Sequence, residues 1–274
     1  MPSGIVIIDK PAGWTSMDVC AKMRGILREK RVGHGGTLDP MATGVLPVFL
    51  GQATRAVEFA ENGEKEYVAG LRLGVVTDTQ DTTGEILETR PVTVDREALA
   101  ALLPRFTGPI EQVPPMYSAI KIGGQKLYEL ARKGREVERK PRSITIFELE
   151  LLEQVSETDY LLRCRCSKGT YLRTLCHDIG QKLGCGACME KLTRTKVSRF
   201  EIKDSLTLAQ IEVLKKEDRL SEILIPIDQM FANYPSIIVS GEAARLAYNG
   251  NGIKDRDVRK DENILDEAYV RVYD

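Results

Sequence analysis

The chain lacks the features of a membrane protein and of a secreted protein. No stretch of its 274 residues approaches the ~18 consecutive apolar residues that a membrane helix needs. The first residues contain neither the basic region nor the long apolar region of a secretory signal. With 42% hydrophobic and 29% charged residues, these absences predict a cytoplasmic protein that makes no membrane contact. The length allows one large domain, or a domain of about 200 residues with a small appendage.

A disulfide framework is also missing, because six cysteines in an intracellular chain of this length indicate reduced thiols. Cys185 and Cys188 have the CxxC spacing of a zinc knuckle, with Cys164 and Cys166 as conceivable partners. However, Cys164 and Cys166 alternate with Leu162 as small buried side chains do along a strand. We therefore expect buried thiols and no metal site.

An overall excess of basic charge is absent too, since the formal net charge is −1. The charges are nevertheless segregated along the chain. Residues 105–143 contain nine Lys and Arg against four Asp and Glu, and residues 163–200 contain nine against two, whereas residues 201–274 are acidic. This distribution is typical of a protein that binds phosphates with one face, although a chance cluster of solvated lysines would look the same.

The chain does contain one isolated carboxylate in a glycine-rich segment, residues 33–44 with the sequence GHGGTLDPMATG. Asp39 is the only acidic residue between Glu29 and Glu58. Because glycines let a ligand approach the backbone, Asp39 is a candidate nucleophile. The alternative is a turn aspartate, since Asp-Pro favours turns.

Strands and helices are expected to follow one another without a strict βαβ rhythm. Thr15 and Asp95 are the expected N-caps of two helices. The expected strands are 5–8, 45–50, 66–73, 143–152 and 159–167, the last two as a hairpin, and the expected helices begin at 15, 53, 95 and 171. This mixture predicts an α+β protein with a mixed, largely antiparallel sheet flanked by helices.

Residues 114–142 differ in composition from the rest of the chain. Basic residues are interleaved with Tyr117 and Tyr128, as in surfaces that bind phosphates and stack on bases. Pro and Gly at both ends indicate an excursion from the core. The simpler interpretation is an amphipathic helix that packs Leu127, Leu130 and Ala131 inward, and an inserted arm would need such an anchor.

Five segments in this order resemble the bacterial tRNA pseudouridine-55 synthases of the TruB family. They are residues 9–16 (DKPAGWTS), 33–44 (GHGGTLDPMATG), 65–67 (KEY), 116–121 (MYSAIK) and 167–173 (SKGTYLR). The resemblance extends over nearly the whole chain, and the GGTLDPxATG segment alone is highly specific. It implies a pseudouridine synthase fold in residues 1–230, with an inserted RNA-binding arm at about 114–142. Residues 231–274 would form a partial PUA-like region that ends early.

The resemblance also implies the reaction, in which uridine 55 in the T-loop of tRNA becomes pseudouridine. The C1′–N1 bond breaks, the uracil turns and a C1′–C5 bond forms, so no cofactor is required. The carboxylate begins this by attacking C1′, by adding to C6 or by supporting a glycal route, and the sequence leaves all three open. The implied partner is the tRNA T-stem-loop, bound by a monomer that needs no protein partner.

The resemblance assigns three residues to catalysis. Asp39 is the catalytic aspartate. Arg173 would pair with it, since a buried cation keeps a carboxylate ionised. Tyr67 would stack on the target uracil and lie where it can take the C5 proton.

Other matched positions are expected to bind the substrate. His34 would occupy the gap left by the flipped base. Tyr171 and Leu192 would line the uracil pocket, with Lys10 and Pro11 supporting it. Also expected at the substrate are Gly36 and Thr37 of the loop and the arm residues Lys121, Lys126 and Arg132. The family's basic Leu-Arg-Arg-Thr appears as residues 192–195, LTRT, with Ser198 near the expected glycine, which predicts the loss of one phosphate contact.

Three other functions compete with this one. An RNA-binding protein or tRNA-folding factor would use the same basic arm, but it would not need Asp39, Tyr67 and Arg173 together. A nucleotide-phosphate loop at 33–44 is disfavoured because no Lys-Ser/Thr follows the glycines. An RNA-guided ribosomal pseudouridine synthase usually has basic tails, which this chain lacks.

Overall fold

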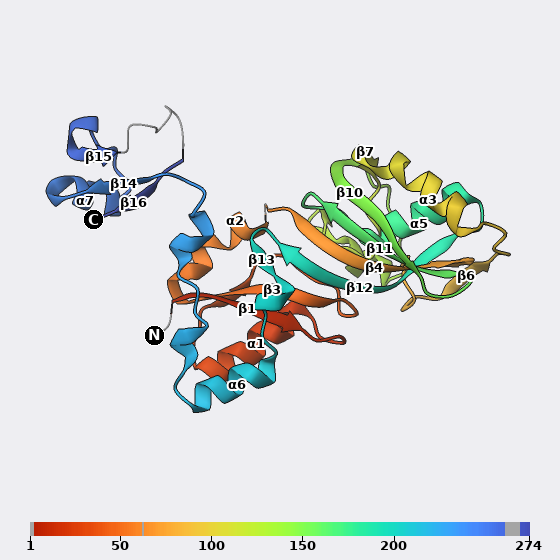
Figure 1. The fold of residues 1–274 in the computed structure, drawn as a ribbon, viewed down its shortest axis with the longest axis horizontal. Helices are drawn as coiled ribbons and strands as arrows, with labels where there is room; N and C mark the ends of the chain where they lie inside the picture. The colour runs from red at the N-terminus through yellow and green to blue at the C-terminus, as the bar shows by residue number, and fades with distance from the viewer. Residues whose placement is uncertain (1–2, 62, 261–268) are drawn as a thin grey trace.

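The computed structural model describes residues 3–61, 63–260 and 269–274. A mixed sheet in the strand order β1-β3-β12-β4-β11-β10-β7 runs through the molecule, with β2 added to β3 and β13 to β12 (Figure 1). Every pairing is antiparallel except β3 with β12. The predicted α+β class with a largely antiparallel sheet is therefore confirmed. The strands are β1 Gly4–Lys10, β2 Val32–His34, β3 Thr43–Leu50, β4 Lys65–Leu73, β7 Gly108–Gln112, β10 Arg142–Gln154, β11 Asp159–Cys166, β12 Ala187–Val197 and β13 Phe200–Glu201.

The β1-β3 end of this sheet is covered on both faces. On one face, helices α1 (Ser16–Leu27) and α6 (Leu208–Lys216) pack on the side chains of Val6, Ile8 and Leu46. On the other face, the 3-10 helix η1 (Gly51–Ala56) and α2 (Val57–Glu61) pack on Ile5 and Phe49. Burial on both faces explains why residues 45–50 are a continuous apolar run rather than an alternating one.

The remaining strands bury only one face, and the candidates Tyr67 and Leu192 lie in the core on that face. Helices α3 (Arg96–Leu102) and α5 (Leu172–Leu183) cover this face, where Leu71, Leu162 and Ile179 form part of the largest core cluster. Along β11 buried residues alternate with more exposed ones. Such alternation is expected of an antiparallel strand with one solvated face.

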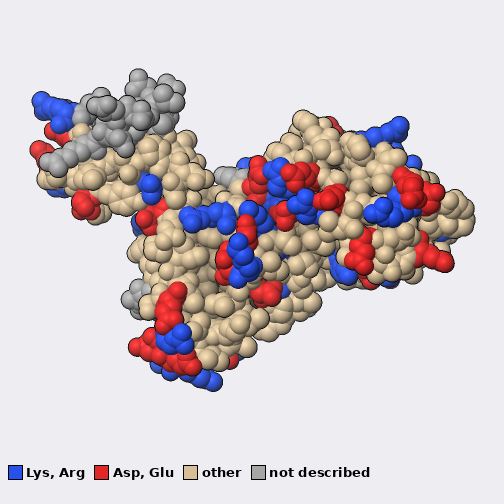
Figure 2. Space-filling view, viewed as in Figure 1, with Lys and Arg blue, Asp and Glu red and all other residues tan. Residues whose placement is uncertain are grey.

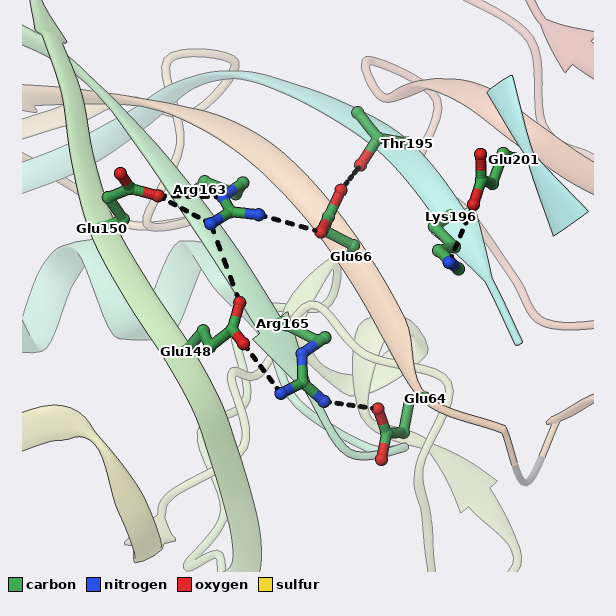
Figure 3. A network of polar contacts seen from close by, with 9 residues as sticks. All are labelled: Glu64, Glu66, Glu148, Glu150, Arg163, Arg165, Thr195, Lys196 and Glu201. Carbon is green, nitrogen blue, oxygen red and sulfur yellow. Dashed lines mark hydrogen bonds and ion pairs between the residues drawn. The ribbon is translucent and has the colours of Figure 1, made fainter. Parts of the chain in front are cut away.

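The solvated face of these strands carries a network of ion pairs (Figure 3). Arg163 contacts Glu66, Glu148 and Glu150, and Arg165 contacts Glu64 and Glu148. Figure 2 shows acidic and basic side chains intermixed over this part of the surface. The predicted basic surplus of residues 163–200 is thus partly neutralised by Glu148 and Glu150 on the adjacent strand β10 and by Glu64 and Glu66, about 100 positions away in sequence.

Residues 113–141 form the arm between β7 and β10. It contains the short strands β8 (Lys121–Ile122) and β9 (Gln125–Lys126) and the helix α4 (Leu127–Ala131). Met116, Leu127 and Leu130 form a small core of its own. Tyr117 Oη lies 3.1 Å from Asp78 Oδ2, in the hairpin of β5 (Val75–Thr77) and β6 (Ile86–Thr89). Both expectations for this segment, an excursion and an inward-packing helix, therefore describe the same element.

A second unit lies beyond the 3-10 helix η5 (Ile227–Phe231). It comprises the sheet β15-β14-β16, formed by Val258–Lys260, Ser236–Val239 and Arg271–Tyr273, and helix α7 (Gly241–Tyr248). Figure 1 shows this unit at the opposite end of the molecule from α3 and α5. Tyr273 Oη donates to Asp228 at 3.2 Å, and Arg271 Nε donates to Tyr234 O at 2.9 Å.

Most element predictions agree with the structure. Thr15 forms a capping box with Asp18, and Asp95 accepts a hydrogen bond from Ala98 N at 2.8 Å. The helix expected at 53–60 is instead a 3-10 helix followed by a short α-helix. Strands β7 and β12 were not predicted, and part of the C-terminal segment lies outside the described residues. Within the described ranges, no helix has the length and apolar character to span a membrane.

Candidate active site

The glycine-rich segment forms a loop between β2 and β3, with Asp39 at its centre. Gly36 has a φ of +92°, in the left-handed region that glycine adopts most readily. The loop is fixed to the start of α1, because Leu38 N donates to Ser16 Oγ at 2.9 Å. Ala42 N donates to Asp39 O at 3.0 Å and closes the turn. Asp39 thus has a defined backbone in a segment without regular secondary structure.

Lys10 fixes one side of this loop through hydrogen bonds to backbone carbonyl oxygens. Its side chain is fully buried at the end of β1, and Nζ donates to the carbonyl oxygens of Pro11 at 2.9 Å, Trp14 at 2.6 Å and Pro40 at 3.2 Å. Burial lowers the pKa of Lys10 to about 8, with Asp39 acting against this shift. The expectation that Lys10 supports the pocket matches this geometry, and Pro11 lies exposed beside it.

Arg194 fixes the other side of the loop. It is fully buried on β12, where Nε donates to Val45 O at 2.8 Å and the terminal nitrogens donate to Gly36 O at 3.2 Å and Thr37 O at 3.5 Å. The backbones of β3 and β12 approach so closely that a Cβ on Gly44 would lie 2.3 Å from Arg194 O. Gly36 and Thr37 were predicted at the substrate, and the structure shows their carbonyls held by this arginine.

Asp39 and Arg173 form the ion pair that the sequence predicts. Arg173 lies in the first turn of α5, and its guanidinium nitrogen is 2.7 Å from Asp39 Oδ2. The Arg173 side chain is 7% exposed and that of Asp39 is 36% exposed, so the carboxylate remains accessible. Burial raises the pKa of Asp39, while Arg173, the strongest opposing influence, lowers it. The net effect raises the pKa of Asp39, and Arg173 offsets part of the rise that burial causes, which favours the ionised carboxylate.

A second carboxylate, Asp81, lies behind Arg173 and was missed in the sequence. It is 3% exposed, and its Oδ2 is 3.7 Å from Arg173 Nη1. Its Oδ1 accepts hydrogen bonds from Thr79 Oγ1 at 2.8 Å, Thr83 N at 2.9 Å and Thr83 Oγ1 at 2.5 Å. Arg173 is thus flanked by a buried carboxylate and an accessible one. Asp81 belongs to an ordinary polar turn, residues 78–85, whose sequence gives no sign of a site. Asp81 comes close to Arg173 only because this turn packs on β12 and α5.

Tyr67 and Leu192 lie on the neighbouring strands β4 and β12. Tyr67 is 7% exposed and pairs across these strands with Arg194, whose positive charge acts to lower the pKa of the phenol. Burial raises the pKa of Tyr67 to about 12, so the phenol is neutral near pH 7. Leu192 on β12 is buried in the same core cluster as Tyr67.

Tyr171 directly precedes α5, and its ring lies 5.9 Å from the Arg173 guanidinium carbon. Burial raises the pKa of Tyr171. His34, five positions before Asp39, is the last residue of β2. It pairs with Val48 of β3. The structure thus brings Asp39, Arg173, Tyr171 and Lys10 into one cluster, and Arg194 connects Tyr67 to the loop.

The arm residues are not part of this cluster. Lys126 Nζ and the Arg132 guanidinium lie 5.3 and 5.4 Å from the Tyr128 ring centre, and Lys121 is exposed on β8. In the part of the chain that the structure describes, no hydrogen bond or ion pair connects these three cations to Asp39 or Arg173. They form instead a basic and aromatic surface on the arm.

The cysteines lie in the core. All six are buried and free of disulfides. Over the described ranges, no group of three or more His, Cys, Asp or Glu side chains could hold a metal ion.

Two family models cover most of the chain. The model described as "TruB family pseudouridylate synthase (N terminal domain)" matches residues 24–172, and the one described as "tRNA pseudouridylate synthase B C-terminal domain" matches residues 173–232. The boundary between them falls at the start of α5.

Curated relatives are similar over most of their length. The tRNA pseudouridine synthase B of Lachnoclostridium phytofermentans is 46% identical, covering 99% of this chain and 92% of the relative. That of Clostridium kluyveri is 44% identical, covering 98% and 91%. Among solved structures, a Cbf5-Nop10-Gar1 complex contains a chain with a TM-score of 0.76 and 29% identity, covering 98% of this chain and 74% of that one.

Proposed function

The chain belongs to the TruB family of pseudouridylate synthases, and we propose that its target is uridine 55 in the T-loop of tRNA. It is an isomerase that converts uridine to pseudouridine in tRNA, as its relatives' names state. The specific position within tRNA follows from the resemblance of the five segments described above. The observation that carries the assignment of the site is the accessible Asp39 paired at 2.7 Å with the buried Arg173.

Asp39 acts as the nucleophile in this proposal. Attack at C1′, addition to C6 and a glycal route each need an ionised, accessible carboxylate, which Arg173 supports. A second acid is not needed to expel the leaving group, because the uracil is retained and reattached through C5. Asp81 keeps Arg173 oriented toward Asp39 and does not itself reach the substrate, since it is buried.

Tyr67 stacks on the uracil and lies near the site of C5 deprotonation. Because its pKa is raised to about 12, the phenol is protonated at the start of the reaction. It can accept the C5 proton only as the phenolate, once its own proton has passed to water, and the positive charge of Arg194 favours that phenolate by lowering the pKa of Tyr67. Replacing Tyr67 with Phe should allow the early steps and slow the final deprotonation, which accumulation of a rearranged but undeprotonated product would reveal.

The substrate is the T-stem-loop, held by the arm. Lys121, Lys126 and Arg132 contact phosphates, and Tyr128 offers a stacking face between two of these cations. His34 fills the space that the flipped uracil leaves in the loop. We assign residues 1–230 to the catalytic domain, with the arm at 114–142, and residues 231–274 to a PUA-like region. The enzyme acts as a monomer.

The test is to incubate tRNA with the protein and to map pseudouridine by carbodiimide-dependent stops of reverse transcription. A stop one nucleotide from position 55 is expected with the native chain and none with Asp39→Asn, because an amide cannot act as the nucleophile. The affinity of Asp39→Asn for tRNA should stay within a few-fold. Turnover of this variant near the native rate would refute the assignment of Asp39.

His34→Ala is the matched variant in this assay. It should slow the reaction much less than Asp39→Asn, since His34 stabilises a flipped state and makes no bond. A loss as complete as that of Asp39→Asn would contradict this role. If tRNA binds but no stop appears at any position, the chain is an RNA-binding factor rather than an active isomerase.

A further inference from the structure

Gln112 connects two parts of the molecule that the reaction uses. It is the last residue of β7, paired with Arg142, so the arm leaves and re-enters the sheet at this pair. Its side chain is 3% exposed and points away from the arm toward α5. A buried amide at the base of a substrate-binding arm needs hydrogen-bond partners, and their identity is informative.

Both partners belong to the backbone of Tyr171. Gln112 Oε1 accepts from Tyr171 N at 2.9 Å, and Gln112 Nε2 donates to Tyr171 O at 3.1 Å. The two residues are 59 positions apart in sequence. One amide group therefore fixes both polar atoms of a single distant peptide segment.

Tyr171 is the N-cap residue of α5, and no side chain caps this helix in the usual way. Tyr171 O also accepts the first helical hydrogen bond, from Leu175 N at 3.0 Å. Gln112 thus supplies the fixation that a capping residue would normally provide. Two positions later, Arg173 extends from the same turn to Asp39.

We propose that Gln112 is a positioning residue of the isomerisation: its amide fixes the start of α5 so that Arg173 meets Asp39 in the productive geometry. The arm is joined to the sheet at the same point, because it begins directly after Gln112 and returns at Arg142, the partner of Gln112 across β7 and β10. The seating of the arm on RNA and the geometry of the catalytic ion pair therefore share one anchor. This inference rests on the proposed role of Asp39 and adds a residue that touches neither the substrate nor the reacting atoms.

The test compares Gln112→Leu with Gln112→Glu in single-turnover assays on a T-stem-loop RNA, with RNA affinity measured separately. Leucine keeps the volume and removes both hydrogen bonds, whereas glutamate keeps the acceptor for Tyr171 N. Gln112→Leu should slow the chemical step by ~10- to 100-fold with RNA affinity within about threefold, because small displacements of catalytic groups have effects of this size. Gln112→Glu should recover part of the rate.

A pH profile separates positioning from general loss of structure. The charged groups that act on Asp39 are Arg173, Asp81 and Lys10, of which Arg173 is the strongest influence favouring ionisation. In Gln112→Leu, a less firmly positioned Arg173 should favour ionisation of Asp39 less strongly. The acid limb of the pH profile, where the rate falls with decreasing pH, should then move to higher pH. Asp95→Ala serves as the control, because it removes the cap of α3 on the same core without touching the site. It should leave the acid limb in place.

A Gln112→Leu rate within twofold of the native rate would overturn the inference, as would a slower rate with an unmoved acid limb. Failure of the native chain to form pseudouridine would instead refute the proposed function. The two failures are therefore distinguishable in one series.

Discussion

At the scale of a single residue, the pKa of Asp39 responds in opposite directions to the Arg173 cation and the Asp81 carboxylate. Asp39 lies 2.7 Å and Asp81 3.7 Å from the Arg173 guanidinium. Arg173 lowers the pKa of Asp39, and Asp81, as a like charge, raises it. Because only the ionised carboxylate is a nucleophile, the rate should fall as the pH drops through the pKa of Asp39.

Arg173→Met and Asp81→Asn should therefore shift the acid limb of the single-turnover rate in opposite directions. Loss of the cation raises the pKa of Asp39 and moves the limb to higher pH. Loss of the like charge lowers that pKa and moves the limb to lower pH. Rates measured from pH 4 to 9 would check this, and a shift to higher pH in both variants would mean that Asp81 acts by orienting Arg173 alone.

At the scale of the element, the arm and strand β12 differ in how well the sequence predicts them. The arm was predicted from its composition, because its small core and its basic and aromatic surface are local properties of residues 113–141. Strand β12 was not predicted, because its apolar positions are interrupted by charged residues such as Arg194. The burial of that arginine depends on Val45, Gly36 and Thr37, which lie about 150 positions away in sequence.

Replacing Lys121, Lys126 and Arg132 together with Ala should weaken RNA binding and reduce its salt dependence. Each lost phosphate contact lowers the slope of log affinity against log salt by about one unit. The single-turnover rate at saturating RNA should change little, since these residues lie outside the Asp39 cluster. Filter binding at several salt concentrations would measure the slope, and an unchanged slope would exclude the arm from phosphate contact.

At the scale of the whole molecule, the formal net charge of −1 hides how the charges are distributed in space. Of the nine basic residues in 163–200, Arg173 and Arg194 are buried, while Arg163 and Arg165 are paired with glutamates on the solvated face (Figure 3). Such exposed pairs contribute little to stability, because water and salt screen their charges. The network serves mainly to cover an open sheet face with balanced charge.

This predicts that Arg163→Gln combined with Arg165→Gln leaves tRNA affinity within about twofold, while the triple substitution in the arm weakens it substantially. Both sets remove basic residues, so the pair of variants controls for the loss of positive charge. Affinity measured at one salt concentration would decide. A comparable loss in both sets would place RNA on the solvated sheet face.

The sequence by itself determined the family and the reaction, and it predicted Asp39, Tyr67 and Arg173 as site residues, because those residues lie in short segments whose local pattern is specific. It also determined the helix caps and the alternating strands, which depend on neighbours in sequence. Only the tertiary structure decided the roles of Asp81, Arg194 and Gln112. Each is an ordinary polar residue in its own segment and acquires a role through partners brought close by folding, since burial obliges a polar side chain to find them.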